Sequence, residues 1–337
     1  MKVAIVGAGA IGGLVGATLA LSGEEVTFIV RGANLEAIRA GGVKILLADG
    51  SEQHAAGVRC TDDYAAAGPQ DLVVLAVKAH QLADIAPRLP ALYGPDTCIV
   101  TMQNGIPFWY FHRHGGALEG TVVRSVDAQG DLARWIPPAR VIGCVVYPAS
   151  ELVAPGVVRH IEGDRFPLGE LDGTTSERVT RVSECFTRAG FKAPVLDDIR
   201  AETWLKLWGN LTFNPISGLA HSTLEDICRF PLSRELAANM MREAQEVAGR
   251  LGISFRVSLE KRIAGAEKVG RHKTSMLQDI EAGRPPEIDA LVGAVIELGQ
   301  LTRTPTPHIS TVYALVRLLA RTMESERAQL RLHALPA

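Results

Sequence analysis

The sequence predicts an α/β protein in which an N-terminal domain with a parallel sheet precedes an all-helical C-terminal domain. Three observations predict this class. A glycine-rich turn stands between two strand-like segments at the start of the chain. Short apolar runs then alternate with helical patterns, which is typical of a buried parallel sheet. From Asp197 onward the apolar residues recur with the 3.6-residue period of helices. We therefore expect two domains, 1–197 and 198–337.

Residues 2–23, KVAIVGAGAIGGLVGATLALSG, admit three interpretations. An apolar segment after a basic residue is typical of a secretory signal, and about 20 apolar residues could also span a membrane. The charged and β-branched segment EEVTFIVRG follows instead of a cleavage site, and it predicts a second strand. A strand over 2–6, a glycine turn, a helix to about Leu21 and a second strand form the opening of a Rossmann-like dinucleotide-binding fold.

The turn itself is expected to contact a pyrophosphate. Gly7 permits the tight turn, Gly9 lets the backbone approach the phosphates, and Gly12 allows close packing of the helix on the strand. The first helical turn offers N–H groups and a partial positive charge to the same anion. The candidate cofactor-binding residues here are Gly7, Ala8, Gly9, Ala10, Ile11 and Gly12.

The rest of the N-terminal half contains further strand signals. Three short apolar runs are expected as strands at 71–78, 97–102 and 193–196. The segments 140–147 and 156–160 are separated by Pro and Gly, and we expect them as antiparallel strands at the sheet edge. Residues 115–138 are rich in glycine and charge and are expected to form an excursion. An amphipathic helix is expected over 174–189.

The C-terminal half is expected to be helical. The expected helices are 199–213, 231–251, 258–269, 286–302 and 307–326. Pro215 should kink or end the first helix, because its ring clashes with the carbonyl group four residues earlier. Pro286 at a helix start, with Glu287 in the first turn, is a common capping arrangement. The charged tail after about residue 326 is expected to fray.

Composition excludes several classes of protein. The formal net charge of −2 gives no basic field for nucleic acid, and no later apolar run is long enough to span a bilayer. The five cysteines are scattered without metal-binding spacing, which indicates reduced thiols in a cytoplasmic protein. Among nine histidines only His112 and His114 stand close together, and no third ligand is near, so no metal site is expected.

Charged residues near strand ends indicate the cofactor. An NAD-specific fold places an acidic residue at the end of the second strand. Here Glu24 and Glu25 stand at its beginning, and Arg31 follows its end. Arginine suits the 2′-phosphate of NADP(H), which it can hold by two parallel charge-assisted bonds; the alternative is a solvated loop arginine. Lys78 ends the next buried strand, where ligands bind in such sheets; the alternative is a surface lysine.

A polar stripe marks the first helix of the C-terminal half. Lys206, Asn210 and Asn214 recur every four residues, which puts them on one face over roughly 12 Å. Most of the remaining helix surface is apolar, so the helix is expected to be buried with its stripe paired or facing a cleft. A solvated face would normally carry mobile charges, and this favours a functional stripe.

On these residues the chain resembles the ketopantoate reductase (2-dehydropantoate 2-reductase) family over nearly its whole length. The matching segments are GAGAIGG at 7–13, Arg31, Lys78, QNG at 103–105, KxxxNxxxNP at 206–215 and SMLQDIEAGRPPEID at 275–289. The resemblance implies a helical domain similar to the C-terminal domain of 6-phosphogluconate dehydrogenase, with the active site in the cleft between the domains. It also implies NADPH-dependent reduction of a 2-oxo acid in the pathway to pantothenate and coenzyme A.

The resemblance further implies roles for single residues. Lys206 looks like the general acid, because an ammonium group stabilises a developing oxyanion and supplies its proton. Asn104 is similar to an asparagine that bridges cofactor and substrate. Glu287 is similar to an acid that meets the cofactor ribose and helps orient the lysine. The positions that match substrate-holding residues are Asn210, Asn214 and Ser275.

Several alternatives stay open on the residues alone. Asn104 could equally be a turn residue in an Asn-Gly loop, and Ser275 a simple N-terminal helix residue. Family members commonly carry an asparagine ten residues after the Asn214 position, where this chain has Leu224, and the excursion 115–138 is longer than usual. Both departures could alter the substrate end of the pocket.

Three functions compete at this point. The first is NADPH-dependent reduction of a 2-oxo acid, with 2-dehydropantoate as the leading candidate. The second is a related two-domain NADP-dependent dehydrogenase acting on another oxo acid or an imine. The third is a non-catalytic NADPH-binding redox sensor, against which Lys206 and its two asparagines argue, since a sensor needs only the N-terminal half. The expected partner is a small-molecule 2-oxo acid. We expect no nucleic-acid or membrane partner. The sequence is compatible with a homodimer.

Overall fold

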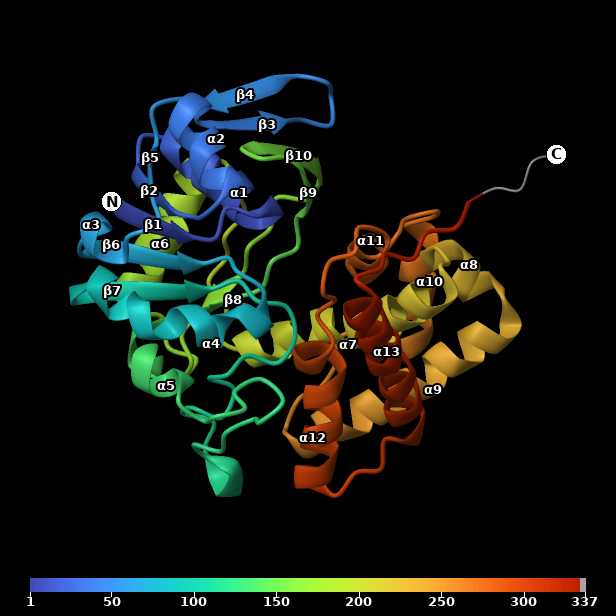
Figure 1. The fold of residues 1–337 in the computed structure, drawn as a ribbon. Coiled ribbons are helices and arrows are strands. Elements are labelled where there is room, and N and C mark those ends of the chain that lie inside the picture. The colour runs from blue at the N-terminus through green and yellow to red at the C-terminus, as the bar shows by residue number, and fades with distance from the viewer. Residues whose placement is uncertain (334–337) are drawn as a thin grey trace. The chain divides into compact units, whose positions relative to one another are not determined.

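The computed structural model describes residues 1–333, which form two compact units (Figure 1). The first unit comprises residues 1–103, 108–122 and 129–199, and the second comprises 104–107, 123–128 and the chain from Arg200 onward. The first is an α/β unit and the second is helical, which confirms the expected fold class. The boundary at residue 197 stays a prediction.

A seven-stranded sheet forms the core of the first unit, in the order β11-β8-β7-β6-β1-β2-β5. Its strands are β1 (Lys2–Val6), β2 (Glu25–Ile29), β5 (Arg59–Thr61), β6 (Gln70–Leu75), β7 (Tyr93–Thr101), β8 (Val141–Cys144) and β11 (Leu168–Gly169). All pairings are parallel except that of β11 with β8. The strand order reverses between β1 and β6, so the glycine turn after β1 lies at the switch point where such sheets bind ligands.

Three expectations about strands are wrong. β8 pairs in parallel with β7, not antiparallel. The strands β9 (Ala149–Ala154) and β10 (Val157–Glu162) do not extend the main sheet, but form a second sheet with β3 (Val43–Leu46) and β4 (Glu52–Ala55). Val157 stands opposite Lys44 in that sheet, a pairing between distant segments that leaves no periodic signal in the sequence. Residues 193–196 contribute a single bridge, Val195 to Leu168.

Helix α1 (Ala10–Leu21) contacts both sheets, and its small residues explain how. A Cβ on Gly13 would lie 2.6 Å from Val158 Cγ2 of β10, and one on Gly16 would lie 2.5 Å from the Phe28 ring of β2. These glycines therefore let two sheets approach one helix closely. Within residues 1–333, no helix has both the length and the apolar character needed to cross a bilayer.

The remaining helices of the first unit cover the main sheet or lie in its loops. They are α2 (Ala33–Gly41), α3 (Tyr64–Ala67), α4 (Leu82–Ile85), α5 (Leu132–Trp135) and α6 (Glu177–Arg188). Within the excursion 115–138, residues 123–128 belong to the second unit. The Glu297 carboxylate holds them there, because it accepts hydrogen bonds from the backbone N–H groups of Arg124 and Ser125, both at 2.7 Å.

Seven α-helices are described in the second unit, up to residue 333. They are α7 (Ile199–Ala220), α8 (Leu224–Arg229), α9 (Pro231–Arg250), α10 (Leu259–Lys268), α11 (Ser275–Glu281), α12 (Ala294–Thr302) and α13 (Pro307–Glu326). Helix α7 does not end at Pro215 but continues to Ala220, because the buried surroundings of residues 211–218 override the local cost of proline. The helix expected from 286 begins at Asp289 as a π-helical turn, Asp289–Gly293. Glu287 therefore precedes the helix, and the first-turn capping account does not apply to it.

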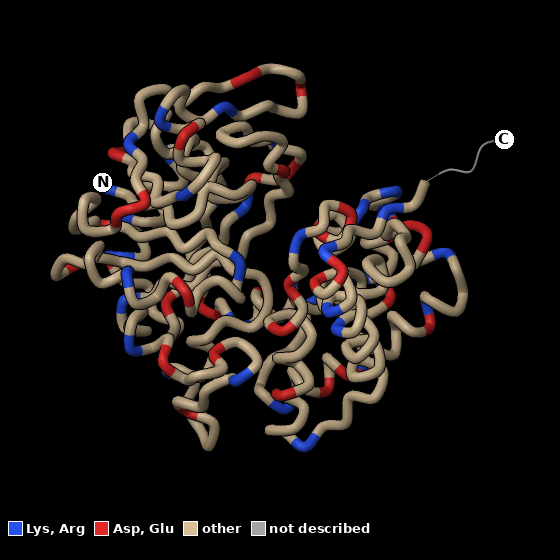
Figure 2. Tube along the Cα trace, viewed as in Figure 1, with Lys and Arg blue, Asp and Glu red and all other residues tan. Residues whose placement is uncertain are grey.

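Charge is mixed along both units. Figure 2 shows basic and acidic positions interspersed along the trace of each unit. Among residues 1–333, no group of three or more His, Cys, Asp or Glu side chains is placed to hold a metal ion.

The glycine turn generates a stability prediction. A Cβ on Gly12 would lie 1.9 Å from the Gly7 carbonyl oxygen, whereas a Cβ on Gly9 would meet nothing within 4 Å. We expect Gly12→Ala to lower the free energy of unfolding by about 1–3 kcal/mol, through forced displacement of backbone. Gly9→Ala is the matched control and should cost about 0.5 kcal/mol. Urea unfolding followed by circular dichroism measures both, and equal losses would contradict the packing account.

The cysteines generate a reactivity prediction. Cys60 is half-buried and the other four thiols are buried. Burial raises the pKa of Cys185 to about 12 and that of Cys228 to about 11, and it also raises the pKa of Cys60, so access to the reagent is what distinguishes Cys60. We expect Cys60 to react with an aromatic disulfide reagent well before the other four in the folded protein. Loss of the fast phase in Cys60→Ser checks this, and an unchanged fast phase in that variant refutes it.

Candidate nucleotide and catalytic sites

The turn between β1 and α1 has open backbone where an anion could bind. Gly7 has φ of +97°, and a Cβ on it would lie 2.8 Å from Val77 Cγ1, so the position requires glycine. Gly9 is the N-cap of α1, and no side chain caps the helix. A Cβ on Gly9 would meet nothing within 4 Å, so there is free space beside the start of α1. A phosphate fits such a helix start.

Asn34 supports this turn, and sequence reasoning missed it. Its Nδ2 donates to the Ala8 carbonyl oxygen at 3.0 Å, while its Oδ1 accepts from the Gly156 N–H at 3.0 Å. One amide thereby ties the turn to the segment before β10. The two partners lie 26 and 122 residues away along the chain, so no local pattern could have indicated the role.

Gln103 links the ends of two neighbouring strands, β7 and β6, near the same turn. Its Nε2 donates to the carbonyl oxygens of Leu75 and Val77, each at 2.9 Å. This joins the end of β7 to the loop that follows β6 and fixes the chain just before Asn104. The QNG segment marked the residue in the sequence, but not this function.

Arg31 and Lys78 lie after the strands that the sequence indicated. Arg31 follows β2, is exposed, and makes no hydrogen bond or ion pair within residues 1–333. It neighbours the Tyr64 phenol: burial raises the pKa of Tyr64, and the charges of Arg88 and Arg31 oppose that rise. The Arg88 guanidinium carbon stands 4.4 Å from the centroid of the Tyr64 ring.

Lys78 follows β6, where its backbone N–H donates to Gln81 Oε1 at 3.0 Å.

In the second unit, three residues that the sequence predicted for the site are joined by a chain of hydrogen bonds. Lys206 Nζ on α7 donates to Asn104 Oδ1 at 2.6 Å. Asn104 Nδ2 donates in turn to Glu287 Oε2 at the longer distance of 3.4 Å. The amide thus presents its oxygen to the ammonium group and its nitrogen to the carboxylate, and all three residues are half-buried.

Gly105 brings Asn104 into this chain. Its φ is +91°, and a Cβ on it would lie 2.2 Å from the carbonyl oxygen of Ala290. The next residue, Ile106, donates its N–H to the same carbonyl oxygen at 2.9 Å. Residues 104–107 therefore dock on the π-helical turn, and Asn104 is both a turn residue and a hydrogen-bond acceptor for Lys206.

The other predicted residues of the stripe leave polar groups for a ligand. Asn210 is half-exposed and Asn214 is 6% exposed, and neither amide makes a hydrogen bond within residues 1–333. Buried amides are normally hydrogen-bonded, so Asn214 suits a ligand-binding position. Ser275 is exposed as the first residue of α11, after the N-cap Thr274.

Helix α11 lies near the Asn214 end of the stripe. A Cβ on Gly218, one turn beyond Asn214, would lie 2.8 Å from Ile280 Cδ1 of α11. Leu224 begins α8 behind Thr223, whose side chain forms a capping box with Asp226. Leu224, where the resemblance led us to expect an asparagine, is therefore the first residue of a capped helix.

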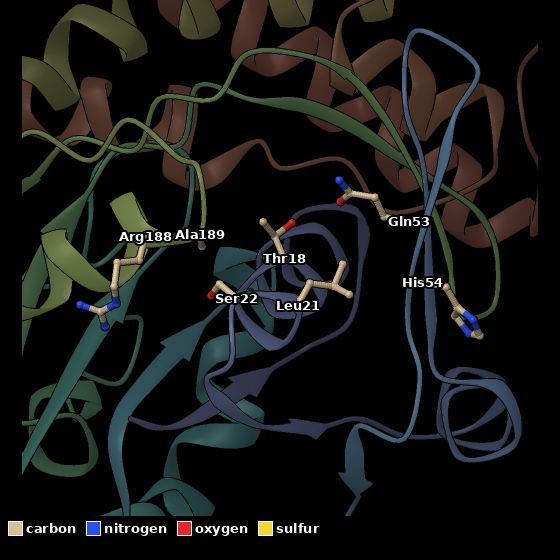
Figure 3. Close-up of a pocket in the computed structure, with 7 residues that line it drawn as sticks. All are labelled: Thr18, Leu21, Ser22, Gln53, His54, Arg188 and Ala189. Carbon is tan, nitrogen blue, oxygen red and sulfur yellow. The ribbon is translucent and has the colours of Figure 1, made fainter.

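A surface hollow lies elsewhere in the first unit (Figure 3). It is lined by Thr18, Leu21, Ser22, Gln53, His54, Arg188 and Ala189. These residues surround the C-terminal end of α1, opposite to the glycine turn. Arg188 is bound to Glu24 at 2.8 Å, and the Ser22 hydroxyl donates to the Leu19 carbonyl oxygen at 2.8 Å. Because these polar groups bond within the chain, we assign the hollow no role in the reaction.

Two family models match the chain. The model for ketopantoate reductase PanE/ApbA matches residues 3–173, and the model for its C-terminal region matches residues 198–320. The chain is also similar to a 2-dehydropantoate 2-reductase of Mesorhizobium japonicum, with 54% identity over 321 residues that cover 95% of this chain and 98% of the relative.

Solved structures agree with this assignment. A candidate ketopantoate reductase from Ralstonia solanacearum is 42% identical, with a TM-score of 0.91 over 96% of this chain and 98% of that one. D-mandelate dehydrogenase with NADH and anilino(oxo)acetate shares the fold at 23% identity, with a TM-score of 0.80 over 96% of this chain and 100% of that one. The protein is a dinucleotide-dependent oxidoreductase, and the chain belongs to the ketopantoate reductase (PanE/ApbA) family.

Proposed function

We propose that the protein reduces 2-dehydropantoate to pantoate with NADPH, within the biosynthesis of pantothenate and coenzyme A. The observation that carries the chemistry is the bonded chain from Lys206 through Asn104 to Glu287. The choice of substrate is supported by the 54% identity with the 2-dehydropantoate 2-reductase of Mesorhizobium japonicum.

Lys206 acts as the proton donor in this proposal. When bound, NADPH supplies the hydride that the C2 carbonyl carbon of the substrate accepts. The carbonyl oxygen then gains negative charge, and the Lys206 ammonium group stabilises it and transfers a proton to it, which yields the 2-hydroxy acid. Asn104 holds the ammonium group by an uncharged acceptor at 2.6 Å, and Glu287 holds Asn104.

The remaining polar groups bind the substrate and the cofactor. Asn210, Asn214 and Ser275 offer amide and hydroxyl donors to the carboxylate and hydroxyl groups of a 2-oxo acid. The turn from Gly7 to Gly12 receives the pyrophosphate, Arg31 the 2′-phosphate and Lys78 a further cofactor anion. Glu287 and Asn104 also contact the cofactor in this proposal. A homodimer stays a prediction.

A panel of 2-oxo acids tests the function. We expect NADPH absorbance to fall fastest with 2-dehydropantoate, and slowly with NADH in place of NADPH. The second candidate is an oxidoreductase for another 2-oxo acid, and it is motivated by Leu224 at the position where the family resemblance leads us to expect an asparagine. A substrate without the terminal hydroxyl group that is reduced faster than 2-dehydropantoate would favour this second candidate. Tight NADPH binding with no turnover of any acid would favour a sensor.

The role of Lys206 generates a kinetic prediction. We expect Lys206→Ala to lower kcat by about 10²–10³-fold, as removal of one oxyanion donor does, while NADPH binding is retained. Lys268→Ala is the matched control, because Lys268 is exposed at the end of α10 in the same unit. Steady-state kinetics and fluorescence titration with NADPH measure the two effects. Near-normal turnover of Lys206→Ala removes the lysine from the mechanism.

The role of Arg31 generates a specificity prediction. We expect Arg31→Ala to raise the Kd for NADPH about 10–100-fold, as loss of charge-assisted hydrogen bonds does, with little change for NADH. Arg39→Ala on α2 is the control, since its guanidinium pairs with Glu36 at 3.3 Å. Equal weakening of both cofactors would refute the assignment of Arg31 to the 2′-phosphate.

A further inference from the structure

A buried carboxylate stands one helical turn before Lys206. Glu202 on α7 is 1% exposed, and its Oε2 lies 2.8 Å from Nη1 of Arg256, whose side chain is 60% exposed. Residues four apart on a helix have Cβ atoms about 5–6 Å from each other. Side chains on a helix also lean toward its N-terminus, so that of Lys206 leans toward Glu202.

Charged side chains from other segments lie along this part of α7. Arg262 of α10 lies against α7, since a Cβ on Gly209 would be 2.4 Å from its Nη2. Arg256 approaches from the segment before α10, and Glu287 reaches Lys206 through Asn104. Two guanidinium groups therefore lie along the same stretch of α7 as the Lys206 ammonium group, and Glu202 is the carboxylate on that stretch of the helix. Neighbouring cations favour loss of the lysine proton, and a nearby carboxylate opposes it.

We propose that Glu202 is a positioning residue that keeps Lys206 protonated against the two neighbouring guanidinium groups, and that the ion pair with Arg256 limits this effect. The inference rests on the proposed role of Lys206 as the proton donor. A donor of this kind must hold its proton until the oxyanion forms, and the buried carboxylate ensures this at a distance from the reacting atoms.

A purely structural role for Glu202 makes a different prediction. The ion pair also anchors the segment that carries Phe255, whose ring stacks on Trp208 with 4.2 Å between centroids. If anchoring were the whole function, removing the charge of Glu202 would lower stability and leave unchanged the pH at which Lys206 loses its proton.

The test measures the proton on Lys206 directly. The pH dependence of Lys206 acetylation by acetic anhydride, read by mass spectrometry on the full-length protein, gives the midpoint of its deprotonation without relying on turnover. We expect Glu202→Gln to lower this midpoint by about one pH unit, and to move the alkaline limb of kcat in the same direction. Glu202→Asp keeps the charge and should restore a midpoint close to that of the original protein, even if it is less stable.

Two further variants guard against misfolding and non-specific effects. Arg256→Gln removes the exposed partner, and the midpoint should rise because Glu202 no longer shares its charge; far-UV circular dichroism of this variant shows whether it is folded. Glu246→Gln is the matched control, because it removes an exposed i,i+4 pair with Arg250 at 4.0 Å on α9 and should leave the midpoint unchanged. An unchanged midpoint in both Glu202→Gln and Arg256→Gln overturns the inference. If the midpoints shift as expected while Lys206→Ala stays active, the proposed function fails instead.

Discussion

The hydrogen bond from Lys206 Nζ to Asn104 Oδ1, at 2.6 Å, is the contact on which the rest of the candidate catalytic site depends. A half-buried ammonium group needs an acceptor, and an amide oxygen provides one without neutralising the charge that a developing oxyanion requires. Asn104 can serve because Gly105 adopts a positive φ and lets residues 104–107 dock on Ala290. The site is thus built by a backbone approach that only glycine permits.

The same constraint governs the nucleotide turn. Gly7 and Gly12 bring the turn, the loop after β6 and helix α1 into backbone contact, while Gly9 leaves the helix start open. Farther along α1, Gly13 and Gly16 allow one helix to contact two sheets. Gly7 and Gly12 are required because a side chain there would clash, whereas a side chain on Gly9 would enter open space. Gly9 is therefore the glycine of this turn that suits contact with a ligand.

Local patterns predicted the elements that depend on neighbouring residues. The strand, turn and helix from Lys2 to Leu21 agree with expectation because alternation and helical period are read within a short window. The second sheet was missed because β3 pairs with β10 across most of the first unit. Helix α7 passes Pro215 and the π-helical turn replaces a regular helix start, because burial of the surroundings outweighs local propensity.

The sequence by itself determined the fold class, the family resemblance and the kinds of side chain at the candidate site, since these follow from spacing and residue type. Only the tertiary structure decided which of them meet. Lys206 and Asn104 are 102 residues apart, and Asn104 and Glu287 are 183 apart, so their contacts leave no periodic trace. Tertiary packing also assigned residues 104–107 and 123–128 to the helical unit, because hydrogen bonds to Ala290 and Glu297 outweigh their position in the chain.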